Sequence, residues 1–177
     1  MTPVTEPAPA WTEHRQLVAD LYTEARDGVY HYLLACGLDA ARSQEVTQEA
    51  FLRLYAVLRE GGTIDNPKGW VYRVAHNIGM DTRRRSARES AYSEAAARTV
   101  ADLSKSAEEE LVEKEWLEGF RDVLNQLSKQ QRLCLELRAQ GLQYREIADV
   151  LRIRTSTVGE FLRRAVKQVR KWNRCRP

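Results

Sequence analysis

The sequence is 177 residues long, 43% hydrophobic and 30% charged, and it carries a formal net charge of +3. This length suits one ordinary domain or two small ones, and the hydrophobic fraction is sufficient for compact cores. Glycine and proline are few, helix-forming residues are abundant, and runs of alternating Val, Ile or Thr are absent. These features argue against a β-sheet protein and predict an all-α fold.

Cysteine usage and hydropathy predict a cytoplasmic protein. Cys36, Cys134 and Cys175 are far apart and have no neighbouring Cys or His at metal-ligand spacing, so we expect free thiols and no metal site. The longest apolar runs are short and interrupted by charge, which argues against a signal peptide and against insertion into a membrane.

Charge is distributed unevenly along the chain. Residues 1–92 carry 11 basic and 12 acidic side chains, residues 93–125 carry 4 and 9, and residues 126–177 carry 13 and 4. A strongly basic helical segment is expected of a protein that binds a polyanion such as DNA. A basic surface that serves only solubility is the alternative, and charge alone does not separate the two.

The N-terminal half predicts a tail and three helices. Residues 1–15 lack helical periodicity and are expected to be disordered. An amphipathic pattern predicts a helix over Gln16–Gly37 with a weak point at Gly28. A second helix, with Ser43 as its cap, covers 43–61, and a third begins at Pro67 and continues into a run of three arginines.

A composition change separates this first domain, residues 16–90, from a second domain at residues 110–177. Residues 91–109 have weak periodicity, small side chains and excess negative charge, which indicates a linker. Within the second domain, Ser128 and Gln131 match the capping box of a helix start, and Gly141 provides the helix end.

Two short helical patterns meet across a polar joint between Gln143 and Arg170. Each carries an apolar stripe at three- and four-residue spacing, and both stripes must be buried together. The end of an ordinary helical bundle is the alternative, but the small Ala148 and a capping Thr155 favour a DNA-binding helix-turn-helix. The face left for the major groove consists of Thr155, Ser156, Gly159, Glu160, Arg163, Arg164 and Lys167.

Two positions of this unit are unusual. Arg152 occupies a turn position where glycine is frequent, so a left-handed backbone there would cost about 1 kcal/mol or more. Glu160 can accept a hydrogen bond from a cytosine amino group, or it can pair with Arg163 or Arg164 on its own helix. The sequence leaves both interpretations of Glu160 open.

Three segments carry a family resemblance: EVTQEAFLRLY at residues 45–55, NPKGWVYRVAHNIGMDTRRR at residues 66–85, and LSKQQRLCLELRAQGLQYREIADVLRIRTSTVGEFLRRA at residues 127–165. In this order and spacing they resemble a bacterial RNA polymerase sigma factor of the extracytoplasmic-function (ECF) group of the sigma-70 family. Departures from the family pattern are Gln143 in place of a serine cap, Arg152 in place of glycine, and the pair Gly159 and Glu160.

The resemblance implies two partners and a regulator. Region 2 and region 4 of such factors bind core RNA polymerase, at the coiled coil of the beta-prime subunit and at the beta flap, and they recognise the −10 and −35 elements of promoter DNA. An anti-sigma factor is a further expected partner, and the acidic linker is either a plain tether or a mimic of RNA. The polar residues that would bind the polymerase, which could otherwise be a solvated helix face, are Glu45, Gln48, Glu49 and Arg53.

The −10 element is expected to bind as a melted strand. Planar rings, hydrogen-bonding groups and a basic cluster suit single-stranded DNA. Trp70 is expected in the core, and His76 is expected to be a polar surface residue rather than a catalytic one. The residues assigned to the −10 strand are Thr63, Ile64, Asp65, Asn66, Lys68, Arg73, His76, Asn77, Arg83 and Arg84.

Two rival classes of protein are less well supported by the sequence. An ordinary helix-turn-helix repressor or activator would not need the segment at residues 66–85. An enzyme would need an active site, but the three histidines are scattered, and no phosphate-binding glycine loop or cofactor motif is present. We therefore expect no catalytic residue and no cofactor.

Overall fold

The computed structural model of the protein describes residues 10–90, 119 and 121–174. Every regular element in this part of the chain is a helix, which confirms the all-α prediction. The chain divides into two compact units, Met1–Tyr92 and Ser93–Pro177. The predicted linker at residues 91–109 lies outside the described residues.

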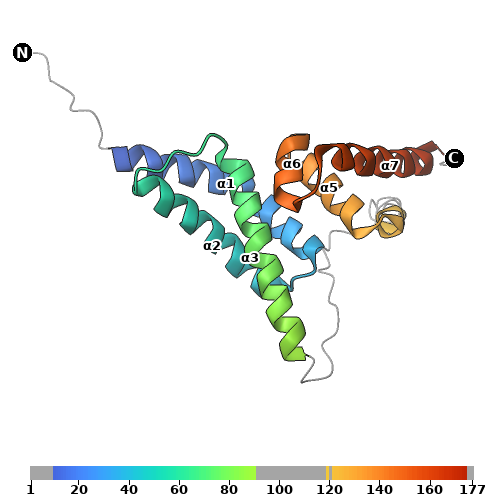
Figure 1. Ribbon diagram of the computed structural model, residues 1–177, viewed down its shortest axis with the longest axis horizontal. Helices are drawn as coiled ribbons and strands as arrows, with labels where there is room; N and C mark the ends of the chain where they lie inside the picture. The colour runs from blue at the N-terminus through green and yellow to red at the C-terminus, as the bar shows by residue number, and fades with distance from the viewer. Residues whose placement is uncertain (1–9, 91–118, 120, 175–177) are drawn as a thin grey trace, which may run out of the picture. The chain divides into compact units, whose positions relative to one another are not determined.

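The first unit consists of three mutually packed helices, α1 (Ala10–Cys36), α2 (Ala40–Arg59) and α3 (Pro67–Ser90). Figure 1 shows α1 and α2 side by side in opposite directions, with α3 crossing them. Their apolar stripes meet in one core because each helix repeats large side chains every three or four residues. The fully buried members of this core include Val29, Leu33, Leu54, Val71 and Tyr72.

Three details of the first unit differ from the sequence prediction. Helix α1 begins at Ala10, so it extends into the predicted tail, and it continues through Gly28 without a break. The cap of α2 is Asp39, whose side chain accepts a hydrogen bond from the Arg42 N–H at 2.8 Å, and not Ser43, which lies buried inside the first turn. Asp39 is the cap because it lies directly before the helix, where its short side-chain oxygen reaches the free N–H groups of the first turn.

The second unit contains α5 (Lys129–Ala139), α6 (Tyr144–Leu151) and α7 (Thr155–Arg174), and residues 121–126 are also helical. The capping box of Ser128 and Gln131 is present as predicted, and Gly141 has a φ of 89° after the end of α5. Helix α7 packs on both α5 and α6 (Figure 1). Its inner face is buried at Val158, Leu162 and Ala165.

The joint between α6 and α7 is the three-residue turn 152–154. Arg152 adopts the left-handed conformation that is costly for a residue other than glycine, with φ 54° and ψ 45°, and its N–H donates to the Ala148 carbonyl. Among the described residues it alone has a positive φ without being glycine. Thr155 is the first residue of α7 rather than the cap before it, which corrects the role expected from the sequence.

Candidate nucleic-acid and polymerase interfaces

Helix α7 presents a continuous polar face beside its buried one. The positions predicted to enter the major groove recur every three or four residues, and the buried positions alternate with them along the helix. Gly159 is half-buried, and the other predicted positions are exposed, namely Thr155, Ser156, Glu160, Arg163, Arg164 and Lys167. The structure therefore brings all seven predicted residues onto one accessible helix.

Glu160 takes part in a surface ion pair. Its Oε2 atom lies 3.4 Å from the Arg164 guanidinium, and the two side chains are 55% and 60% exposed. Of the two arginines considered as partners, the structure selects Arg164. Such a pair contributes at most about 0.5 kcal/mol, so both side chains are free to exchange it for contacts with DNA.

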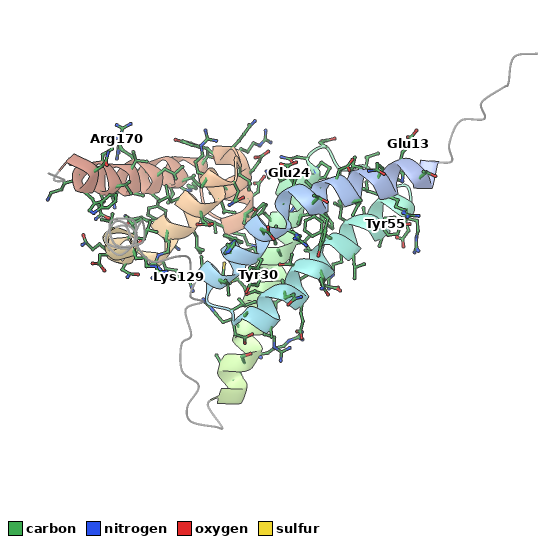
Figure 2. The ribbon with its side chains drawn as sticks, turned by 180° about the vertical axis from the view of Figure 1, so that it is seen from behind. Glu13, Glu24, Tyr30, Tyr55, Lys129 and Arg170 are labelled. Carbon is green, nitrogen blue, oxygen red and sulfur yellow. The ribbon has the colours of Figure 1, made fainter. Side chains whose placement is uncertain are left out.

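Positive charge continues along α7 past the predicted reading residues. Residues 161–177 contain seven basic side chains and no acidic one. Arg163, Lys167, Arg170 and Lys171 are exposed, and none of them forms an ion pair with another described residue. Figure 2 shows Arg170 extending outward from α7. A row of unpaired cations on one helix favours contact with phosphates.

The loop before α3 presents polar groups and starts the helix. The Asn66 side-chain oxygen accepts a hydrogen bond from the Gly69 N–H at 3.0 Å, so it caps α3. Thr63 and Asp65 are exposed and Ile64 is half-buried. The sequence prediction missed this capping role, although an Asn directly before Pro67 is a recognisable helix-start signal.

Two of the residues predicted to bind the −10 strand are tied into the first unit. Lys68 Nζ lies 2.9 Å from the Glu24 carboxylate of α1, which is labelled in Figure 2. His76 Nδ1 and the buried Tyr32 hydroxyl share a hydrogen bond of 2.7 Å. The sequence predicts a polar surface residue at His76; in the structure the residue is half-buried, and this hydrogen bond joins its ring on α3 to α1. Trp70 is half-buried as well, where the sequence predicts a core position.

The arginine run at the end of α3 divides into two kinds of residue. The Arg83 guanidinium donates a hydrogen bond to the Cys36 carbonyl at 2.9 Å, so it satisfies one of the carbonyls left free at the C-terminus of α1. Arg84 pairs with Asp81. A shallow open hollow on the surface is lined by Asp81, Arg84, Arg85 and Arg88. Arg73, about three turns earlier on α3, is exposed.

The predicted polymerase-binding residues surround an apolar side chain on α2. Leu52 is 63% exposed, and helical spacing places it between Gln48 and Glu49 on the face that also carries Glu45. Glu49 pairs with Arg53 at 2.7 Å. An apolar centre with a polar rim is the usual anatomy of a protein interface. The sequence prediction missed Leu52 because its neighbours at 51 and 54 are core residues.

Two helical units, one of which ends in a helix-turn-helix with an exposed basic second helix, define a DNA-binding protein of transcription. Comparison with known proteins gives its family. Residues 21–89 match the model of Sigma-70 region 2, and residues 117–169 match the model of Sigma-70 region 4.

Curated relatives and a solved structure agree with these matches. The ferric citrate uptake sigma factor FecI of Escherichia coli is 30% identical over 157 residues, which are 84% of this chain and 89% of FecI. The ECF RNA polymerase sigma factor SigK of Mycobacterium tuberculosis is 29% identical over 165 residues, 86% of this chain and 83% of SigK. The fold is similar to that of the sigma factor RpoE from Bartonella quintana, crystallised with the anti-sigma factor NepR. That similarity has a TM-score of 0.66 at 16% identity and covers 92% of this chain and 99% of RpoE.

The chain belongs to the ECF group of the sigma-70 family of RNA polymerase sigma factors. It is a sigma factor that binds core RNA polymerase, recognises −35 and −10 promoter elements and promotes DNA melting for transcription initiation. Its relatives are transcription initiation factors. No helix in the described part of the chain has the length and apolarity needed to cross a bilayer.

Proposed function

We propose that the two units divide promoter recognition between them. The unit at residues 16–90 captures the melted −10 strand and holds core polymerase, the segment at 91–109 links the units, and the unit at 110–177 reads the −35 duplex. The exposed polar face of α7 carries this proposal, because it combines base-reading groups with unpaired cations on one helix.

Different parts of helix α7 are proposed to contact bases and phosphates. Ser156, Gly159, Glu160 and Arg163 lie on its first turns, where a recognition helix meets base edges. Lys167 and the basic residues after it follow on the same side and suit phosphates. Base contacts then set which −35 sequence is read, while phosphate contacts set affinity and its dependence on salt.

For the −10 strand we propose a narrower set of contact residues than the ten predicted. Thr63, Asp65 and Arg73 are exposed and offer hydrogen-bonding or charged groups to a flipped base and its phosphates. Asn66, His76 and Arg83 act mainly by fixing α3, because each forms a hydrogen bond that holds a helix end or a helix pair.

Core polymerase is proposed to bind the Leu52-centred face of α2, defined by Glu45, Gln48, Glu49, Leu52 and Arg53. Burial of an exposed leucine on a partner helix supplies the apolar gain, and the ionic rim sets orientation. The beta-prime coiled coil fits this face, and the beta flap is the proposed second contact, with region 4. An anti-sigma factor, such as the one bound to RpoE, would compete for these surfaces.

Transcription-start mapping with the reconstituted holoenzyme tests the proposal. We propose that the protein works in the cytoplasm without catalysing a reaction of its own, so core polymerase must supply all bond chemistry. Start sites sharing one −35 and one −10 sequence are expected, and Arg163→Ala should weaken run-off transcription about tenfold. Gln168→Ala, exposed on another side of α7, is the matched control. A chain that binds duplex DNA tightly alone but yields no transcript would instead be a repressor or activator.

A further inference from the structure

Tyr144 is an exposed aromatic residue beside the reading helix. It is the first residue of α6, its side chain is 44% exposed, and it is the one large hydrophobic residue described in the second unit that is exposed to this degree. Single exposed apolar residues are common, so exposure alone assigns no role. Its position relative to α7 is the informative observation.

The Tyr144 ring lies against Gly159 of α7. A Cβ atom built on Gly159 would lie 3.8 Å from Tyr144 Cε2, which is an ordinary van der Waals distance, and apart from its chain neighbours and the adjoining backbone of α7 no other described atom would lie within 4 Å. Packing therefore does not require glycine at this position, although glycine weakens a helix interior. Gly159 stands between Ser156 and Arg163 on the reading face, so the missing side chain leaves the ring uncovered there.

The ring is also held in place from α5. The Arg138 guanidinium lies over the Tyr144 ring, 5.7 Å from its centroid. Arg138 is itself fixed, since its Nη1 donates a hydrogen bond to the Leu142 carbonyl at 2.9 Å. A cation on one face and the α7 backbone beside its edge restrict the ring before any DNA binds.

We propose that Tyr144 is a specificity-determining residue, whose ring takes the place of the side chain absent at position 159 and contacts the C5-methyl group of a thymine in the −35 element. The inference rests on the proposed placement of α7 in the major groove. Thymine is the one base with an apolar group in that groove, whereas an apolar ring over any other base edge would leave donors or acceptors without partners. The proposal places the thymine methyl group against the ring edge and the Gly159 backbone, where no side chain of position 159 intervenes.

Deoxyuridine substitution tests this contact, because it removes the methyl group and nothing else. Each thymine of the mapped −35 element is replaced singly by deoxyuridine, and holoenzyme affinity is measured for the wild-type chain, Tyr144→Phe, Tyr144→Ala and the control Gln130→Ala, an exposed change on α5. At one position, deoxyuridine should lower the DNA affinity of the holoenzyme about fourfold when the sigma factor is wild type, Tyr144→Phe or Gln130→Ala, which is the effect of one buried methyl group. The same substitution should leave the affinity of the Tyr144→Ala holoenzyme unchanged.

Three results would overturn the inference. The first is a deoxyuridine effect that is the same in wild type and Tyr144→Ala at every position. The second is a −35 element without thymine. The third is loss of affinity in Tyr144→Phe on every sequence, which would make the hydroxyl a phosphate contact. A holoenzyme that starts no transcript refutes the proposed function itself, whereas one that starts transcripts but fails the deoxyuridine test refutes only the role of Tyr144. Circular dichroism of each variant checks folding.

Discussion

Replacing Gly159 by alanine tests how much stability the glycine costs helix α7. The substitution replaces a poor helix former by the best one in the second turn of a 20-residue helix, which is worth about 0.8 to 1 kcal/mol. The added methyl meets only Tyr144, at 3.8 Å, so no strain offsets the gain. For a unit of this size, about 1 kcal/mol raises the midpoint of thermal unfolding by roughly 4 to 8 °C.

The assay is calorimetry of the full chain, with hydrogen exchange of the α7 amides to assign the transition to the second unit. The matched control is Gly79→Ala in α3, where the new methyl would lie 2.9 Å from Cδ2 of the buried Leu33. The helix gain is the same there, but the contact must be relieved inside a packed core, so stability should not rise. Equal stabilisation at both positions, or none at Gly159, would refute the reasoning.

Four further outcomes follow from the contacts described. Arg83→Ala should destabilise the first unit by about 1 to 2 kcal/mol in urea unfolding, through the lost cap on α1, whereas Arg85→Ala should leave stability unchanged; equal losses would contradict the capping role. Lys167→Ala should lower promoter affinity equally for all sequences and reduce the slope of log affinity against log salt by about one, and a change in base preference would refute a phosphate contact. Leu52→Ala should weaken core polymerase binding about tenfold in a fluorescence titration without changing stability, because the side chain is 63% exposed; unchanged binding would remove Leu52 from the interface. Burial raises the pKa of the Cys134 thiol from 9.0 to about 11, so between these pH values the thiol ionises in the unfolded chain but not in the folded one. The free energy of unfolding of the second unit should therefore be unaffected by this thiol below pH 9 and fall by up to about 3 kcal/mol as the pH rises to 11; Cys134→Ala should reduce this fall with pH.

Local signals explain which parts of the fold could be predicted from the sequence. The capping box at Ser128 and the left-handed Gly141 depend on residues a few positions apart, so they are readable directly. The expected weak point at Gly28 fails because one glycine costs about 1 kcal/mol, which the buried neighbour Val29 and the rest of a 27-residue helix outweigh. Where two caps compete, as at Asp39 and Ser43, sequence spacing alone does not choose.

The candidate sites also contain residues whose placement follows from the sequence and residues whose contacts do not. Helical periodicity is enough to place Glu160 and Lys167 on the outward face of α7, because the buried stripe fixes the opposite side. The partners of His76 and Arg83 are 44 and 47 residues away in the sequence, so their hydrogen bonds emerge only from the packing of α3 on α1. Leu52 is missed for a related reason: its exposure depends on where α2 meets its neighbours.

Departures from local stability rules gather at the surface proposed to read DNA. Arg152 holds a left-handed turn at a cost of about 1 kcal/mol, Gly159 weakens α7 by a similar amount, and Tyr144 leaves an aromatic ring in water. Away from this surface the second unit follows the rules, with a complete capping box at Ser128 and a glycine at the end of α5. Residues that lower folding stability are expected to cluster where a surface serves to bind a partner. Changes at Gly159 and Tyr144 should therefore alter DNA binding, although neither residue belongs to the core.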